Sequence, residues 1–142
     1  MMTEPDLPDL ANDLRLACQR IARRVRFEGT QAVAPHQFSV LVRVHHEPAT
    51  PTALAERERV STPSMTRTVN GLVELGLVTK QPHPDDGRQL LVVPTAEGER
   101  VVEQTIAERD SWMMQHLASL EPDQLQLLRQ AADLLLEVAA HE

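Results

Sequence analysis

Short polar side chains recur at helical spacing in one stretch near the middle of this chain. One side of the stretch carries hydroxyl and amide groups with a single guanidinium, on Ser64, Thr66, Arg67 and Asn70. The other side carries apolar residues at i, i+4, i+7 and i+8, which are Met65, Val69, Leu72 and Val73. Hydroxyl, amide and guanidinium groups are the ones that bind base edges and phosphates in the major groove of DNA. The spacing therefore predicts an amphipathic helix over about 62–75 whose polar side faces a nucleic acid.

Thr62 and Pro63 stand where this helix begins. Threonine is a good N-cap residue, and proline is favoured in the first turn because the N–H that it lacks has no partner there. The other early N–H groups then point outward, at the end of a helix where a phosphate binds. We therefore include Thr62 and Pro63 among the residues expected to contact DNA.

A second, shorter helix is expected over about 52–58, immediately before the polar helix. Two helices that cross steeply over a tight turn need a small residue where they touch, and Ala55 supplies it. Leu54 and Val60 continue the apolar seam between the two helices. A pair of this kind is a helix-turn-helix, whose second helix enters the major groove.

Two β-prone runs follow at 77–81 and 89–95, separated by a loop rich in proline, aspartate and glycine. Such a pattern predicts a β-hairpin with a long turn. Arg88 lies near its tip, with Asp86 close by in sequence. An arginine already oriented by a carboxylate enters a narrow minor groove at a lower entropic cost. Arg88 and Asp86 are therefore expected at a second DNA contact, with Lys80 on a phosphate beside them.

Helices are also expected on both sides of this central region. Before it, apolar residues recur at helical spacing from Asp9, a second helix begins at Pro35 and ends before Pro48, and residues 1–8 form a loose arm. After it, a long helix is expected between Gly98 and Pro122.

The final segment, 123–140, carries apolar residues on two adjacent helical faces. One neighbouring helix covers only one such face, so a second copy of the chain is expected to cover the remainder. The predicted fold class is therefore mainly α with a small β-hairpin wing. It is a winged helix-turn-helix with dimerisation helices at its N- and C-terminal ends.

Two groups of residues carry a resemblance to a known family. In the helix-turn-helix they are Leu54-Ala55-Glu56-Arg57, Val60-Ser61, Pro63, Thr66-Arg67, Val69, Leu72 and Gly76-Leu77-Val78. In the wing they are Pro84-Asp85-Asp86-Gly87-Arg88, followed by Val92, Thr95 and Gly98. This ordered set resembles the MarR family of regulators, named for multiple antibiotic resistance. The resemblance covers nearly the whole chain, since the order and length of the flanking helices also fit.

The resemblance implies a single domain over 1–142, with dimerisation helices at about 9–34 and 97–142 and a DNA-binding region at about 35–96. It further implies a bacterial homodimer that grips a palindromic operator in double-stranded DNA and represses transcription by excluding polymerase. Many members of the family release DNA when a small phenolic or lipophilic effector binds. An effector is therefore expected, with no residue assigned to its site.

Three departures from the family pattern affect these expectations. Glu58 and Arg59 stand in the turn where the family usually has an apolar residue and glycine. A residue other than glycine held at positive φ costs about 1 kcal/mol, so the turn is expected to be reshaped or strained. Gly71 replaces a common basic residue and removes a phosphate contact. Pro94 is expected to shorten the second wing strand because it lacks an N–H.

No pattern in the chain indicates catalysis or metal binding. There is no sign of a Ser–His–Asp arrangement. The single cysteine cannot form a Cys-x-x-Cys pair, and the six histidines show no His-x-x-x-His spacing. We therefore predict that the protein is not an enzyme and that it uses no metal and no cofactor. The acidic N-terminus is unlike a signal peptide, and no apolar run approaches the roughly 18 residues of a membrane span. A cytoplasmic protein without membrane contact is expected.

The formal net charge of −7 is unusual for a protein that binds DNA. Residues 97–142 hold ten acidic and three basic residues, which accounts for all of it, and residues 1–96 carry eleven of each sign. Phosphate attraction falls off over a Debye length of about 8 Å, so a neutral half with a small basic face remains competent.

Two alternatives stay open at this point. The acidic balance and the missing charge at Gly71 also suit a winged helix that has become a protein-interaction module. A metal or redox sensor on the same scaffold is the other alternative. Cys18 lies on the apolar stripe of the first helix and is expected to be buried and inert, although a redox role stays open. The arginine run Arg15, Arg20, Arg23, Arg24 and Arg26 fits a solvated helix face better than a DNA surface.

Overall fold

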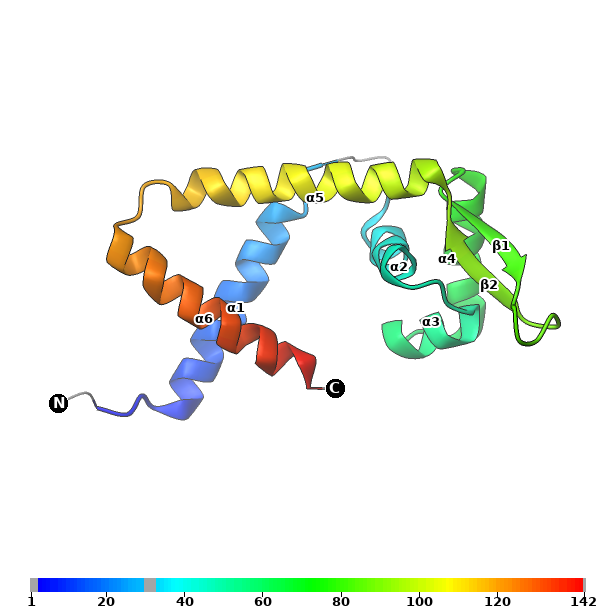
Figure 1. The fold of residues 1–142 in the computed structure, drawn as a ribbon. Coiled ribbons are helices and arrows are strands. Elements are labelled where there is room, and N and C mark those ends of the chain that lie inside the picture. The colour runs from blue at the N-terminus through cyan, green and yellow to red at the C-terminus, as the bar shows by residue number, and fades with distance from the viewer. Residues whose placement is uncertain (1–2, 30–32, 142) are drawn as a thin grey trace. The chain divides into compact units, whose positions relative to one another are not determined.

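The structure is a computed structural model, and it describes residues 3–29 and 33–141. Within these residues it contains six helices and one two-stranded antiparallel sheet (Figure 1). The elements in chain order are α1 (Leu7–Val25), α2 (Pro35–His46), α3 (Pro51–Glu58), α4 (Thr62–Glu74), β1 (Val78–Pro82), β2 (Leu90–Pro94), α5 (Ala96–Leu117) and α6 (Pro122–Ala140). The chain divides within α5 into two compact units, Met1–Arg109 and Asp110–Glu142. None of the helices among the described residues has the length and apolar character needed to cross a bilayer.

The core of the first unit lies where α2, α3 and α4 meet the hairpin (Figure 1). Its fully buried side chains are Val40, Leu41, Val44, Leu54, Met65, Val69, Leu72, Val78, Val92 and Val102. Ala55 is also buried, which confirms the small residue expected where α3 and α4 cross. This arrangement confirms the predicted fold class of a mainly helical protein with a β-hairpin wing.

The starts of the helices follow from local capping chemistry. Asp6 accepts a hydrogen bond from the Asp9 N–H at 3.3 Å, and Thr50 accepts one from the Ala53 N–H at 3.2 Å. Each of these oxygens satisfies a backbone donor that the first turn of a helix leaves without an intrahelical partner. The helix α1 consequently begins at Leu7, so the expected loose arm over 1–8 is two residues too long.

The hairpin pairs Val78 with Pro94 at its base and Pro82 with Leu90 toward its tip. The strand β2 ends at Pro94, in line with the missing N–H of that residue. Ala49, in the link between α2 and α3, forms an additional antiparallel bridge with Val92, with N–O distances of 2.8 and 3.4 Å. The sequence reasoning missed this bridge, which ties the wing to the helices beneath it.

Two apolar residues of the predicted helix-turn-helix seam are exposed instead of buried. Val60 is 42% exposed and Val73 is 40% exposed. Val60 follows the end of α3, and its N–H donates to the Ala55 carbonyl at 3.1 Å. Val73 lies at the edge of the buried stripe of α4, which the core residues Val69 and Leu72 already fill.

The second unit contains the end of α5 and all of α6. The Trp112 and His116 rings stack at a centroid distance of 3.9 Å, and His116 Nδ1 lies 2.8 Å from the Trp112 carbonyl oxygen. The helix α6 begins at Pro122, where the Gln124 side chain accepts from the Glu121 N–H at 3.0 Å. No residue of α6 is buried, and most of its leucines are exposed, among them Leu127, Leu134 and Leu136 at 63–67%.

Candidate nucleic-acid interface

The polar side of α4 is exposed, as the sequence predicts. Thr66, Arg67 and Asn70 are exposed, and Ser64 is half-buried. Met65, Val69 and Leu72 on the opposite side are buried in the core. The Thr66 hydroxyl donates to the Thr62 carbonyl at 3.0 Å, which leaves its oxygen free to accept from a donor outside the protein. The helix therefore presents acceptors, an amide and a guanidinium on one continuous side.

The N-cap of α4 is Ser61, one residue earlier than expected. Its hydroxyl accepts from the Ser64 N–H at 3.2 Å, so Thr62 and Pro63 both lie in the first turn. The predicted Thr62 cap is wrong because either hydroxyl suits this role and only the hydrogen bond decides between them. Pro63 has no N–H, and the Thr62 N–H has no hydrogen-bond acceptor among the described residues, so it is the first-turn donor that remains available.

The turn between α3 and α4 is held by a left-handed residue. Arg59 has φ 57° and ψ 45°, and it is the one residue other than glycine with positive φ among those described. A residue other than glycine thus takes positive φ where the family pattern has glycine, as the sequence analysis expects. Its N–H bonds to the Glu56 carbonyl at 3.2 Å, which closes the end of α3.

The Lys80 side chain of β1 reaches α4. Its Nζ donates to Asn70 Oδ1 at 2.6 Å, and both residues are exposed. These two residues come from different elements and were assigned separately from the sequence. The bond joins the polar side of α4 to the first strand of the wing, so the two form one surface.

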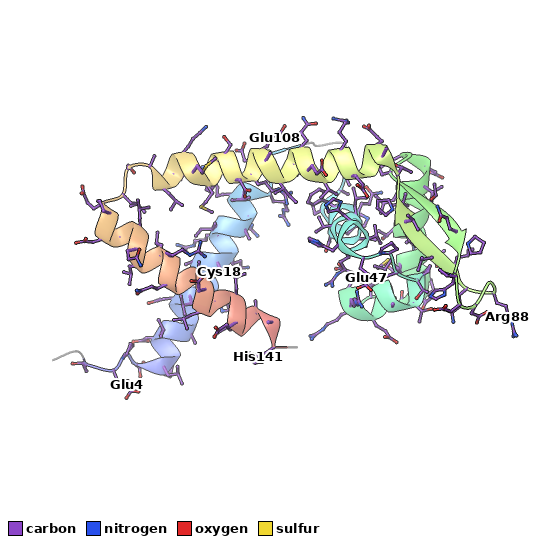
Figure 2. The ribbon with its side chains drawn as sticks, viewed as in Figure 1. Glu4, Cys18, Glu47, Arg88, Glu108 and His141 are labelled. Carbon is purple, nitrogen blue, oxygen red and sulfur yellow. The ribbon has the colours of Figure 1, made fainter. Side chains whose placement is uncertain are left out.

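Arg88 stands at the tip of the wing with its side chain 96% exposed (Figure 2). Asp86 Oδ1 accepts from the Arg88 N–H at 3.1 Å and lies 3.9 Å from Arg88 Nε. The carboxylate thus folds the tip and keeps the guanidinium near it, as the sequence analysis proposes. At this exposure the ion pair itself contributes little to stability.

The base of the wing is fixed by Thr95, just after β2. Its hydroxyl donates to the Gly76 carbonyl at 2.7 Å and accepts from the Gly98 N–H at 3.0 Å. A side chain at Gly98 would collide with the Leu77 carbonyl oxygen. The threonine and glycine of the wing signature are therefore the residues that let α5 approach the backbone after α4.

Gly71, the departure within α4, faces α2. A Cβ at this position would lie 2.7 Å from the Gln37 amide nitrogen. Gln37 Oε1 in turn accepts from the Ala34 N–H at 3.0 Å, at the start of α2. The absent side chain thus accommodates the residue that caps α2.

Glu58 ties the end of α3 to α2. Its Oε1 accepts from the Ser39 hydroxyl at 2.6 Å and from Arg43 Nε at 2.7 Å. Partial burial raises the pKa of Glu58, but the hydrogen bonds from Ser39 and Arg43 and the charge of Arg43 outweigh it, so the pKa falls below its ordinary 4.5. From the sequence, Glu58 was noted only as a departure from the family pattern. Its contact with Arg43, 15 positions earlier in the chain, explains why an acid stands there.

A cavity of about 440 Å³ lies within the first unit beside α2. Its lining includes Phe38 and Val42, together with three arginines, Arg26, Arg43 and Arg109. The Arg109 guanidinium lies 4.6 Å from the centroid of the Phe38 ring. Sequence reasoning left Arg43 and Arg109 unassigned, because residues so far apart in the chain give no spacing signal.

Cys18 is exposed on α1, so the expected buried thiol is wrong for the protomer (Figure 2). No residue of α1 is buried, and its apolar stripe is open to solvent, including Leu10 and Ile21 at 39% and 46% exposure. The five arginines of the predicted basic run lie on or just after this helix; Arg15 bonds to Asn12 and Gln19. Among the described residues, no group of three or more potential metal ligands lies close together.

A helix-turn-helix followed by a β-hairpin defines the class of winged helix-turn-helix proteins. The model of the MarR family matches residues 33–89, which span α2, α3, α4 and most of the wing. An HTH-type transcriptional regulator of Mycobacterium leprae is 45% identical over 131 residues, which are 91% of this chain and 92% of that protein. An HTH-type transcriptional regulator of Mycobacterium tuberculosis is 43% identical over 129 residues, covering 89% of this chain and 90% of that protein. The chain belongs to the MarR family of HTH-type transcriptional regulators.

Solved structures share this fold. A transcriptional regulator of Pseudomonas aeruginosa superposes with a TM-score of 0.82 at 27% identity, covering 97% of this chain and all of the other. The MarR protein of E. coli superposes with a TM-score of 0.69 at 23% identity, covering 94% and 99%. Regulators of this family are not enzymes, in agreement with the sequence analysis.

Proposed function

We propose that this protein is a homodimeric repressor that binds a palindromic operator in double-stranded DNA. In this proposal α4 enters the major groove and the wing enters the adjacent minor groove. The residues in contact are Thr62, Pro63, Ser64, Thr66, Arg67, Asn70, Lys80, Asp86 and Arg88. Arg67 and Asn70 are suited to base edges, because guanidinium and amide groups make paired hydrogen bonds there.

The observation that carries this proposal is the 2.6 Å bond between Lys80 and Asn70. It supports a single contact surface that extends from α4 into the wing. Arg67 and Arg88 are exposed on this surface, and the charge of Glu58, the last residue of α3, is paired with Arg43. The local charge is therefore compatible with a phosphate backbone in spite of the acidic net charge.

The dimer is supported by the exposed apolar side chains of α1 and α6. Soluble monomers rarely leave such surfaces uncovered, and a two-fold dimer covers the same patch on both copies. We assign residues 9–34 and 97–142 to dimerisation and residues 35–96 to DNA binding, within one domain. Two copies then present α4 to consecutive major grooves about 34 Å apart. We further propose that the protein represses transcription in the cytoplasm and that a small phenolic or lipophilic effector releases it from DNA.

The proposal is tested by fluorescence anisotropy on a duplex from upstream of the encoding gene, with a scrambled duplex for comparison. Arg67→Ala is expected to weaken specific binding by about fivefold to a hundredfold and to relax base preference, since a paired base contact contributes about 1–3 kcal/mol. Arg88→Ala is expected to weaken binding mainly through the wing. Arg100→Ala is the matched control, because that guanidinium is bonded to Glu97 and Gln104 within α5.

Because Arg100 is not among the assigned contacts, Arg100→Ala should lower affinity for the duplex only by the small effect of removing one distant positive charge. If Arg67→Ala and Arg88→Ala both bind like the parent protein, the assigned contacts are wrong. If the parent protein does not distinguish the two duplexes, sequence-specific binding at this site is wrong.

A further inference from the structure

Arg59, in the turn between α3 and α4, holds a backbone conformation that costs an arginine free energy. Its φ of 57° and ψ of 45° lie in the left-handed region, where a Cβ clashes with the backbone and glycine has none. The residue is exposed, and within residues 3–29 and 33–141 its guanidinium has no hydrogen-bond or ion-pair partner. No polar contact of the side chain inside the protomer therefore offsets the cost.

The turn itself does not need this side chain. The Arg59 N–H bonds to the Glu56 carbonyl at 3.2 Å, and the Val60 N–H bonds to the Ala55 carbonyl at 3.1 Å. These two bonds form a Schellman motif, in which glycine is the usual left-handed residue. Glu58 then fastens the end of α3 to α2. A glycine at position 59 would close the same turn with less strain.

The charges around Arg59 leave its guanidinium available to an anion outside the protein. The acid next to it in the chain, Glu58, is paired with Arg43 at 2.7 Å. Glu56 borders a hollow between the start of α3 and the wing. Arg57 is exposed, as Arg59 is. At the end of α3, two guanidinium groups thus have no carboxylate partner among the described residues.

The position of Arg59 in the helix-turn-helix indicates which anion this is. It lies two residues before Ser61, the N-cap of α4. In a helix-turn-helix the N-terminal part of the second helix contacts base edges in the major groove, while the first helix crosses the sugar–phosphate backbone. The turn that joins the two helices is therefore next to the phosphates that border the groove.

We propose that Arg59 binds a phosphate of the operator backbone at the edge of the major groove, and that this contact offsets the strain of its left-handed backbone. The inference rests on the proposed DNA-binding function and adds to it a contact outside the assigned set. Phosphate contacts carry no sequence information directly. Arg59 consequently adds affinity for any sequence, whereas Arg67 supplies preference among sequences.

The experiment uses the full chain and measures fluorescence anisotropy on the operator duplex and on the scrambled duplex at two salt concentrations. Each phosphate contact releases bound cations from DNA, so its contribution to log affinity falls by about 0.9 for a tenfold rise in salt. We expect Arg59→Ala to weaken binding to both duplexes by about tenfold at about 50 mM salt and by about threefold at about 200 mM. The ratio of the two duplex affinities should stay that of the parent protein.

Two further variants separate the charge of Arg59 from its strain. Arg59→Lys keeps both the positive charge and the Cβ, so it should retain the salt dependence of the parent protein and most of its affinity. Arg59→Gly removes the charge and the strain together. It should unfold at a higher urea concentration than the parent protein and still bind both duplexes as weakly as Arg59→Ala does. A side chain with a purely structural role would change stability and affinity in the same direction.

Arg100→Ala is the matched control, since that guanidinium is bonded to Glu97 and Gln104 within α5. It should retain the salt dependence of the parent protein. If Arg59→Ala does not fold, Arg59→Gly carries the test, because glycine suits the conformation of the turn.

The inference is overturned if Arg59→Ala and Arg59→Gly bind with the affinity and salt dependence of the parent protein. A loss confined to the operator duplex would overturn it too, since Arg59 would then contact a base, as would an equal loss in Arg59→Lys. The proposed function fails separately, when the parent protein binds both duplexes equally, because the effect of Arg59 on salt dependence is still measured on either duplex. A parent protein that binds neither duplex would overturn both.

Discussion

The arginines of this chain differ in their surroundings. Arg67 and Arg88 are exposed, whereas Arg43 is held by Glu58 and Arg109 lies over an aromatic ring. Arg59 is set apart by its backbone, which takes the left-handed conformation that usually belongs to glycine. At the residue scale, these side chains are distinguished by their partners and backbone conformation more than by their residue type.

The backbone of Arg59 allows a direct test of the strain in the turn. We expect Arg59→Gly to raise the free energy of unfolding by about 1 kcal/mol, because glycine takes positive φ without the clash of a Cβ. Arg59→Ala removes the same charge and retains the Cβ, so it should give no such gain. Urea denaturation of the three proteins measures the difference. Equal stability of the glycine and alanine variants would show that the turn is unstrained.

The acid of the turn gives a prediction on pH. The pKa of Glu58 is lowered in the folded protein, so its contribution is complete above the ordinary value of 4.5 and is lost as the pH falls through the lower folded value. We expect Glu58→Gln to cost about 1 kcal/mol at pH 7, a modest figure because the pair is partly exposed. That cost should shrink steadily below pH 4.5 in denaturation series. A cost unchanged down to pH 3 would contradict the assigned ion pair.

At the scale of elements, the wing depends on the close approach of α5 to the backbone after α4. We expect Gly98→Ala to lower the free energy of unfolding by about 3 kcal/mol or more, since the added methyl group meets the Leu77 backbone carbonyl, which cannot move aside alone. Gly87→Ala, at the wing tip, has open space around it and should change stability by about 0.5 kcal/mol or less. Thermal unfolding followed by circular dichroism separates the two, and similar melting temperatures would refute the close approach.

At the scale of the whole molecule, α1 and α6 each carry exposed apolar side chains. We predict a dimer at micromolar concentration and a shift to monomer in Leu134→Glu, which places a charge on an exposed face of α6. Leu75→Glu alters a leucine that is also exposed, at 45%, but lies outside both helices, so it should leave the dimer intact. Sedimentation velocity distinguishes these states. A monomeric parent protein would remove the basis for two-fold operator binding.

The helices and strands followed from local patterns that the chain carries within a few residues. Apolar spacing located α4 and its buried side, and Pro35 and Pro122 marked where α2 and α6 begin. Gly98 was wrong as the start of the long helix, because α5 begins at Ala96 and Gly98 lies inside it, where α5 meets the Leu77 backbone. The unusual turn at Arg59 was expected from the family resemblance, because the family pattern has glycine where this chain has Arg59. The predicted start of α4 was wrong because two neighbouring residues, Ser61 and Thr62, can each cap a helix through a hydroxyl group, and the sequence does not choose between them.

The sequence by itself determined the class of fold, the polar side of α4 and the charged wing tip, since periodicity and turn chemistry act over a few residues. Only the tertiary structure decided that Lys80 bonds to Asn70, that Glu58 fastens α3 to α2, and that arginines 83 positions apart border one cavity. The reason is physical: contacts between elements depend on how those elements pack, and packing is set by the core as a whole and not by any short stretch of it.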